Sequence, residues 1–182
     1  MNTVEPIRDI ETVNDIASYL KEESERNYIM FLIGIYSGLR ISDILKLRVR
    51  NVKDKDRIFI TEQKTGKQRR FPLNKSLRKE LAHYIQGMKE WEFLIKSQKG
   101  PNQPISRQQA WQILRKAGEH FGLECIGTHT LRKTFGYHLY RQNGGDIVTV
   151  QRILNHSTAD YTRRYIGITQ DTMDQAMKDL HY

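Results

Sequence analysis

The chain has 182 residues, of which 38% are hydrophobic and 28% charged. This composition predicts one folded domain with a single well-filled core and excludes a disordered chain. The formal net charge of +9 and the pI near 9.7 favour a polyanionic partner, with nucleic acid ahead of a membrane. Cys125 is the only cysteine, which excludes an internal disulfide and a thiolate metal cluster and fits a reducing cytoplasm.

The first third of the chain is predicted to be helical. Residues 9–23 carry apolar side chains at helical spacing. Residues 26–37 are apolar nearly all round and stop before Gly38, a suitable C-terminal cap. The apolar run in this second helix is shorter than the ~20 residues that cross a bilayer, so we expect a buried helix. Ser42 is expected to cap a short third helix, with Arg40 at the junction between the two.

After the third helix, apolar side chains recur at every second residue, as in a β-strand. Residues 57–61 and 69–73 are predicted strands, joined through residues 64–67 into a β-hairpin with Gly66 in its turn. Residues 49–52 are a candidate third strand. We therefore expect an antiparallel sheet of about three strands.

Helical patterns return after the hairpin. We place them at residues 74–95, 106–122, 130–142, 147–154, 161–165 and 170–180. The last helix has an apolar stripe formed by Met173, Ala176, Met177 and Leu180. No linker divides the chain, so we expect residues 1–182 to form one mostly helical α+β domain.

One set of basic and aromatic side chains fits metal-free cleavage of a DNA strand. The attacked phosphate gains negative charge, which the planar, permanently charged fork of arginine binds well. A tyrosine phenol, with an ordinary pKa of ~10, needs an acceptor or a positive field to attack at neutral pH. The departing oxygen needs a proton from a lysine or a histidine. The chain offers Arg40, Lys64, His129, Arg132, His156 and Tyr165 for these tasks.

Four sequence blocks hold these residues: SGLRISDIL, QKTGK, THTLRKTFG and LNHSTADYTRRYIGI. In their order, and with Tyr165 nine residues after His156, the chain resembles the catalytic domain of the tyrosine recombinase (phage-integrase-like) family over nearly its whole length. The resemblance implies a site-specific DNA recombinase or integrase that needs no metal and no other cofactor. It also implies double-stranded DNA as a partner and a homo-tetramer on DNA, coupled through the C-terminal helix, and it implies no membrane association.

The resemblance gives Tyr165 the role of the nucleophile, which forms a 3′-phosphotyrosyl intermediate and frees a 5′-hydroxyl. Arg40 and Arg132 are expected to clamp the phosphate. Tyr161 lies one helical turn before Tyr165, so geometry alone does not choose between the two phenols. The spacing from His156 favours Tyr165.

The resemblance assigns the remaining groups as well. Lys64 is expected to protonate the leaving oxygen, although Lys67, Arg69 and Arg70 crowd the same hairpin. His129 is expected to accept the phenol proton, with a helix cap as its alternative role. His156 is expected to bind a phosphate oxygen, and Asp43 to orient the site.

Recombinases of this family commonly grip DNA between an N-terminal helical domain and the catalytic domain. Arg40 lies so near the first residue that we expect the N-terminal domain to be absent, in either a fragment or a natural minimal protein. Two rival functions share the fold: DNA relaxation of the type IB topoisomerase kind, and a catalytically silent DNA-binding regulator. The sequence leaves the target site, and integration as against excision, undetermined.

Overall fold

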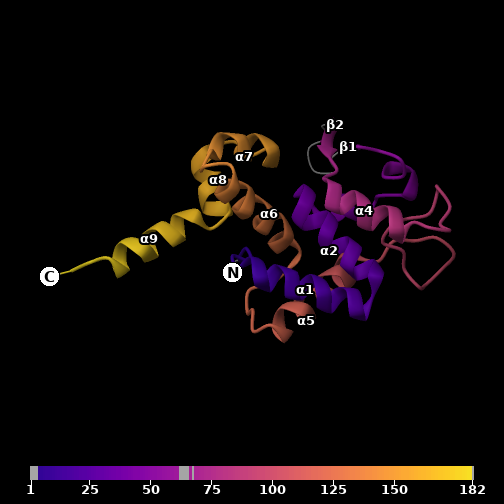
Figure 1. Ribbon diagram of the computed structural model, residues 1–182, viewed down its shortest axis with the longest axis horizontal. Helices are drawn as coiled ribbons and strands as arrows, with labels where there is room; N and C mark the ends of the chain where they lie inside the picture. Colours follow the sequence, from indigo (N-terminus) through magenta and orange to yellow (C-terminus); the bar gives the residue numbers. More distant parts are fainter. Residues whose placement is uncertain (1–3, 62–65, 67, 182) are drawn as a thin grey trace.

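The computed structural model describes residues 4–61, 66 and 68–181 (Figure 1). Its helices are α1 (Ile10–Glu23), α2 (Glu25–Ser37), α3 (Ile41–Ile44), α4 (Lys75–Tyr84), α5 (Arg107–His120), α6 (Thr128–Gln142), α7 (Ile147–Leu154), α8 (Ala159–Tyr165) and α9 (Ile168–Lys178). Strands β1 (Arg57–Thr61) and β2 (Gln68–Pro72) pair as an antiparallel hairpin. The mostly helical α+β class with a small antiparallel sheet is confirmed.

Short polar side chains begin several helices where the sequence predicted. The carboxylate of Asp9 accepts from the backbone N–H of Thr12 at the start of α1, and the Ser106 hydroxyl accepts from that of Gln109 at the start of α5. The expected cap at Ser42 is wrong. Gly38 turns the chain at φ +63, and extended Arg40 precedes the helix, so Ser42 lies within α3.

Two expected elements differ in the structure. The candidate third strand is instead a 3₁₀ turn, Val49–Asn51, whose neighbour Arg48 makes only an isolated bridge to Phe93. The helix expected to continue toward residue 95 ends at Tyr84, because Gly87 adopts φ +80 and redirects the chain. The segment that follows turns inward and buries Ile95 completely.

The buried apolar side chains form two clusters, and α6 spans both. The larger cluster is built mainly from α1 to α5 and the hairpin, with the buried helix α2 at its centre. The smaller one contains Ile147, Val150, Leu154 and Ile166, from α7 and the end of α8. Leu131 of α6 packs in the larger cluster and Phe135 in the smaller. Residues between these two positions on α6 therefore lie where the clusters meet.

Replacing Gly38 by alanine should destabilise the protein by about 2–4 kcal/mol. A Cβ at this position meets Cδ1 of Phe135 at 2.3 Å, and the backbone φ of +63 disfavours any L side chain. Gly87→Ala is the matched control, because its φ is +80 but nothing lies within 4 Å of an added Cβ, so only the backbone strain remains. Urea denaturation measures both variants, and an equal loss of stability in the two would contradict the steric argument.

Helix α9 extends away from the rest of the molecule (Figure 1). None of its residues is buried, and Met173 and Met177 are 49% and 76% exposed. Against the described part of the chain, Met173, Met177 and Leu180 of the predicted apolar stripe therefore remain exposed. Within the described ranges, no helix has the length and apolar character that crossing a membrane requires.

Candidate active site

A cavity of about 270 Å³ lies where α3, α5 and α6 begin. It is lined by Arg40, Ile41, Ser42, Arg107, Thr128, His129 and Arg132. Three guanidinium groups thus surround one small space. The N-terminal ends of α5 and α6 add the positive ends of two helix dipoles. This concentration of positive potential suits a phosphate group.

Arg132 is the most deeply buried cation at this cavity, with 2% exposure. Its Nη1 donates to the carbonyl of Gly38 and its Nη2 to the carbonyl of Leu154, both at 2.5 Å. Gly38 ends α2 beside the larger apolar cluster, whereas Leu154 ends α7 in the smaller one. The guanidinium therefore holds the two clusters together and is itself fixed in orientation.

The hydroxyl of Tyr165 lies 3.3 Å from Nδ1 of His129, a long hydrogen bond across the α6–α8 contact. Burial raises the pKa of Tyr165, while the positive charges of Arg132 and Arg40 act in the opposite direction. Tyr161, the rival phenol, is 48% exposed. Its ring stacks on that of Tyr165, with the ring centroids 6.1 Å apart. Of the two hydroxyls, that of Tyr165 is the one beside a candidate proton acceptor.

His156 is half-buried. Its ring packs edge-on against that of Tyr165, with the ring centroids 4.7 Å apart. Its Nδ1 lies 3.2 Å from Oγ1 of Thr162, whose hydroxyl donates its only proton to the carbonyl of Thr158. His156 Nδ1 must therefore carry the proton in this contact. Burial, followed by the charges of Arg132 and Arg40, lowers the pKa of His156 to about 4. The ring is neutral at physiological pH.

This environment predicts a pH dependence of stability. The unfolded chain protonates His156 near its ordinary pKa of 6.5, the folded protein only near 4, so the unfolded state binds more protons between these values. The free energy of unfolding should therefore fall as pH decreases from about 6.5 to about 4. His156→Gln should reduce this slope in urea titrations. Identical slopes in the two proteins would contradict the assignment.

The remaining predicted site residues are Lys64 and Asp43. Lys64 lies outside the described residues, as does its rival Lys67. Arg69, a third candidate on the hairpin, donates through Nη2 to the carbonyl of Ile153 and thereby connects β2 to the end of α7. Asp43 is 3% exposed on α3. It lies three residues after Arg40 in the chain, and its expected role in orienting the site stays a prediction.

Sequence reasoning missed Arg107 and the burial of Lys133. Nothing in the local pattern distinguishes Arg107 from other surface arginines. Lys133 lies on α6 with only 6% exposure. A lysine seldom suggests burial in a sequence, and only the packing around α6 reveals its position.

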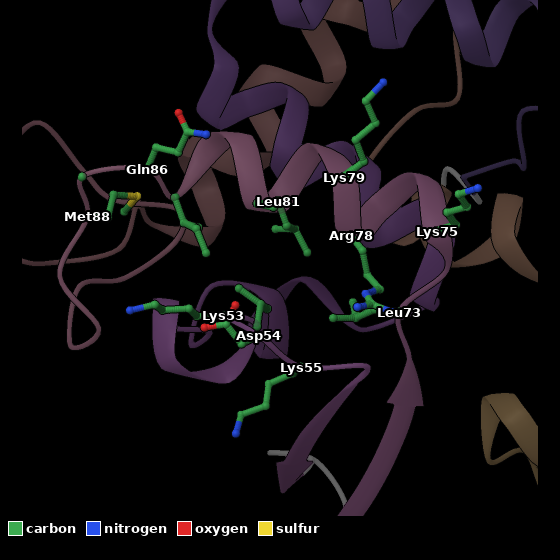
Figure 2. Close-up of a pocket in the computed structure, with 14 residues that line it drawn as sticks. Lys53, Asp54, Lys55, Leu73, Lys75, Arg78, Lys79, Leu81, Gln86 and Met88 are labelled. Atoms are coloured by element: carbon green, nitrogen blue, oxygen red, sulfur yellow. The ribbon is translucent and has the colours of Figure 1, made fainter.

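A larger groove, about 850 Å³, lies elsewhere, between α4 and the segment before β1. It is bordered by Lys53, Lys55, Lys75, Arg78 and Lys79, with Asp54 as its acidic member. Figure 2 shows Lys75 and Lys79 pointing away from the 53–55 segment. Its cations do not converge on one point, in contrast with those of the smaller cavity.

Comparisons with known proteins agree with this geometry. A sequence model of the phage integrase family matches residues 8–171. The probable integrase/recombinase YoeC of Bacillus subtilis (strain 168) is 51% identical over 98% of this chain and 97% of its own length. The tyrosine recombinase XerD of Corynebacterium glutamicum is 31% identical over 100% of this chain and 60% of its own length.

Among solved structures, the post-cleavage complex of the XerH site-specific recombinase with a palindromic difH substrate has a TM-score of 0.72 and 20% identity. That match covers 98% of this chain and 53% of XerH, so the chain spans just over half the length of XerH and nearly all of YoeC. The fold, the converging cations and these matches lead to one conclusion. The chain belongs to the phage integrase family and is a tyrosine recombinase, a class of enzymes that cleave and rejoin DNA.

Proposed function

We propose that the chain carries out site-specific recombination of double-stranded DNA through a covalent bond to Tyr165. The observation that carries this proposal is the 3.3 Å contact between Nδ1 of His129 and the Tyr165 hydroxyl, next to the cavity that Arg40 and Arg132 line. The groups proposed as base and nucleophile thus lie next to the cationic cavity proposed to bind the phosphate. The proposed catalytic domain comprises residues 1–182, acting on DNA in the cytoplasm.

The proposed reaction balances without a cofactor. The Tyr165 oxygen attacks phosphorus, its proton passes to His129, and the bond from phosphorus to the 5′-oxygen breaks. Lys64 is proposed to protonate that oxygen. The resulting 3′-phosphotyrosyl bond retains the energy of the phosphodiester, so the 5′-hydroxyl of a partner strand can attack it in the reverse sense without ATP.

The cations are proposed to act on the charge that develops at phosphorus. Arg40 and Arg132 bind the non-bridging oxygens, and Asp43 orients the site from within the protein. His156 can donate a hydrogen bond to a phosphate oxygen only after it binds a second proton. With its one proton on Nδ1, the neutral ring presents Nε2 as an acceptor. The negative charge of the bound phosphate favours this uptake.

A nicked suicide substrate tests the proposal, because cleavage beside the nick lets the short 5′-fragment diffuse away and prevents rejoining. We expect a pool of nicked duplexes of random sequence to yield a covalent protein–DNA adduct on denaturing gels, in the presence of EDTA. Sequencing of the trapped DNA should reveal a defined site. Relaxation of supercoiled plasmid at many unrelated sites would favour topoisomerase-like function instead, and DNA binding without any adduct would favour a silent regulator.

We also propose that the protein assembles as a homo-tetramer on DNA, with α9 of each copy docked on a neighbour. The exposed stripe of Met173, Met177 and Leu180 supports this part of the proposal, since an amphipathic helix without an intramolecular partner is a common docking element. The start of α9 has a different role, because Asp171 forms an ion pair with Arg8 at 2.8 Å.

The double substitution Met173→Ser and Met177→Ser should reduce assembly on DNA by roughly 10-fold or more, because both side chains lose apolar contact area. Monomer stability should be unchanged, since neither side chain is buried and the ion pair of Asp171 is retained. Analytical ultracentrifugation with DNA measures the first effect and urea denaturation the second. Wild-type assembly in the double variant would remove the support for docking through α9.

A further inference from the structure

Lys133 is a buried cation for which the proposed reaction has no use. It follows Arg132 on α6 and is 6% exposed. Within the described ranges, no carboxylate lies within 4.0 Å of its ammonium group. Burying an ammonium group without an ion pair costs free energy that a methionine at the same place does not. A contact that offsets the cost of burying the Lys133 ammonium group therefore points to the role of this residue.

The ammonium group of Lys133 lies over the ring of Tyr165, with Nζ 5.3 Å from the ring centroid. A cation over an aromatic face is attracted by the ring, more strongly when both are removed from water. The hydroxyl of the same tyrosine lies 3.3 Å from Nδ1 of His129 and close to the guanidinium of Arg132. Lys133 thus contacts the ring of the proposed nucleophile from α6, the helix that carries both its proton acceptor and a phosphate clamp.

The segment before α1 packs against α6 next to Lys133 and places Glu5, an opposing charge, near its ammonium group. The backbone N–H of Ile7 donates to the Thr134 hydroxyl, and the carbonyl of Ile7 contacts Nε2 of His138, both at 2.9 Å. This segment holds Glu5 beside Arg8 at 3.1 Å. Burial lowers the pKa of Lys133, Glu5 raises it and Arg8 lowers it again.

We propose that Lys133 is a positioning residue for strand cleavage, whose ammonium group holds the Tyr165 ring in place and favours its ionised form. The inference rests on the proposed role of Tyr165 as nucleophile. A positive charge near a phenol stabilises the phenolate over the phenol, which adds to the effect of Arg132 and Arg40 on the same group. Among the residues that the structure describes, His156 and Tyr161 are further titratable groups that contact the ring.

The variant Lys133→Met separates this role from a structural one. Methionine fills a similar volume without a charge, so the protein should be as stable as wild type or more so. Adduct formation on the nicked substrate should nevertheless be roughly 10-fold slower at neutral pH, and its rise with pH should move to higher pH. Lys133→Arg should restore most of the rate, and the affinity for DNA should not change.

Lys21→Met is the matched control. Lys21 also lies over a tyrosine ring, that of Tyr28 at 4.8 Å, but it is exposed and forms an ion pair with Glu80. Its loss should leave adduct formation unchanged. Equal cleavage rates and pH profiles in wild type and Lys133→Met, with adduct formed in both, would overturn the inference while leaving the proposed function intact.

A second measurement does not depend on catalysis. In protein labelled with ¹³C-tyrosine, the resonance of Tyr165 can be identified by its disappearance in Tyr165→Phe. Its pKa should move upward in Lys133→Met and return toward the wild-type value in Lys133→Arg. If the substrate yields no adduct with any variant, the proposed function fails, and an unchanged pKa of Tyr165 in Lys133→Met would still contradict the inference independently.

Discussion

Tyr165→Phe should abolish the covalent adduct with the nicked substrate, lowering its rate of formation by at least roughly 10³-fold. Phenylalanine retains the ring that packs against His156 and Lys133 but lacks the oxygen that attacks phosphorus. DNA affinity should remain close to that of wild type, because the cations that line the cavity are unaltered. Denaturing gels report the adduct and fluorescence anisotropy the affinity.

Tyr161→Phe is the discriminating control. Its phenol is exposed and makes no hydrogen bond to His129, whereas the Tyr165 hydroxyl lies 3.3 Å from that imidazole. The adduct should therefore persist in Tyr161→Phe within a few-fold of the wild-type rate. The reverse pattern would identify Tyr161 as the nucleophile and give Tyr165 a packing role.

Arg132→Ala should lose both catalysis and stability. Two buried carbonyls, those of Gly38 and Leu154, lose their donor in this variant. Each unsatisfied acceptor costs about 1–3 kcal/mol, so the free energy of unfolding should fall by about 2–5 kcal/mol. Adduct formation under conditions where the variant remains folded should fall by at least roughly 10²-fold, because the phosphate loses a fixed cation.

Arg107→Ala separates the two effects. Arg107 lines the same cavity, but it is exposed at the start of α5, so its removal should weaken DNA binding with little change in the free energy of unfolding. Urea denaturation of the two variants, side by side, measures the difference. Equal stability of Arg132→Ala and wild type would show that the two carbonyl contacts are unimportant.

The sequence predicted a helix correctly where a short polar capping residue and the spacing of apolar residues indicate the same boundaries. The helices expected from residues 9 and 106 begin there, with Asp9 and Ser106 as their caps, and residues 147–154 form the predicted helix without correction. Predictions failed where contacts between residues distant in the chain determine the local structure. Val49 donates its N–H to the distant carbonyl of Glu92, and this contact replaces the predicted strand pairing with a turn.

For the candidate site, residue spacing indicated which groups to examine but not how they meet. Arg40 and Arg132 were chosen from local motifs and do line one cavity. The contact of His129 with Tyr165 spans 36 positions in the chain, so no local pattern predicts it. The burial of Lys133 arises from tertiary packing around α6, against which the segment before α1 also lies. The catalytic roles themselves remain predictions.

The two carbonyl contacts of Arg132 tie the proposed cleavage site to an intact fold. One carbonyl belongs to each apolar cluster, so the guanidinium is oriented only when α7 and α8 are docked on the rest of the protein. A nascent or partly opened chain would hold Tyr165 and Arg40 on separated parts. Its positive charge would still attract it to DNA, but the proposed nucleophile and phosphate clamp would not meet. On the proposed mechanism, DNA binding therefore requires less of the fold than strand cleavage does.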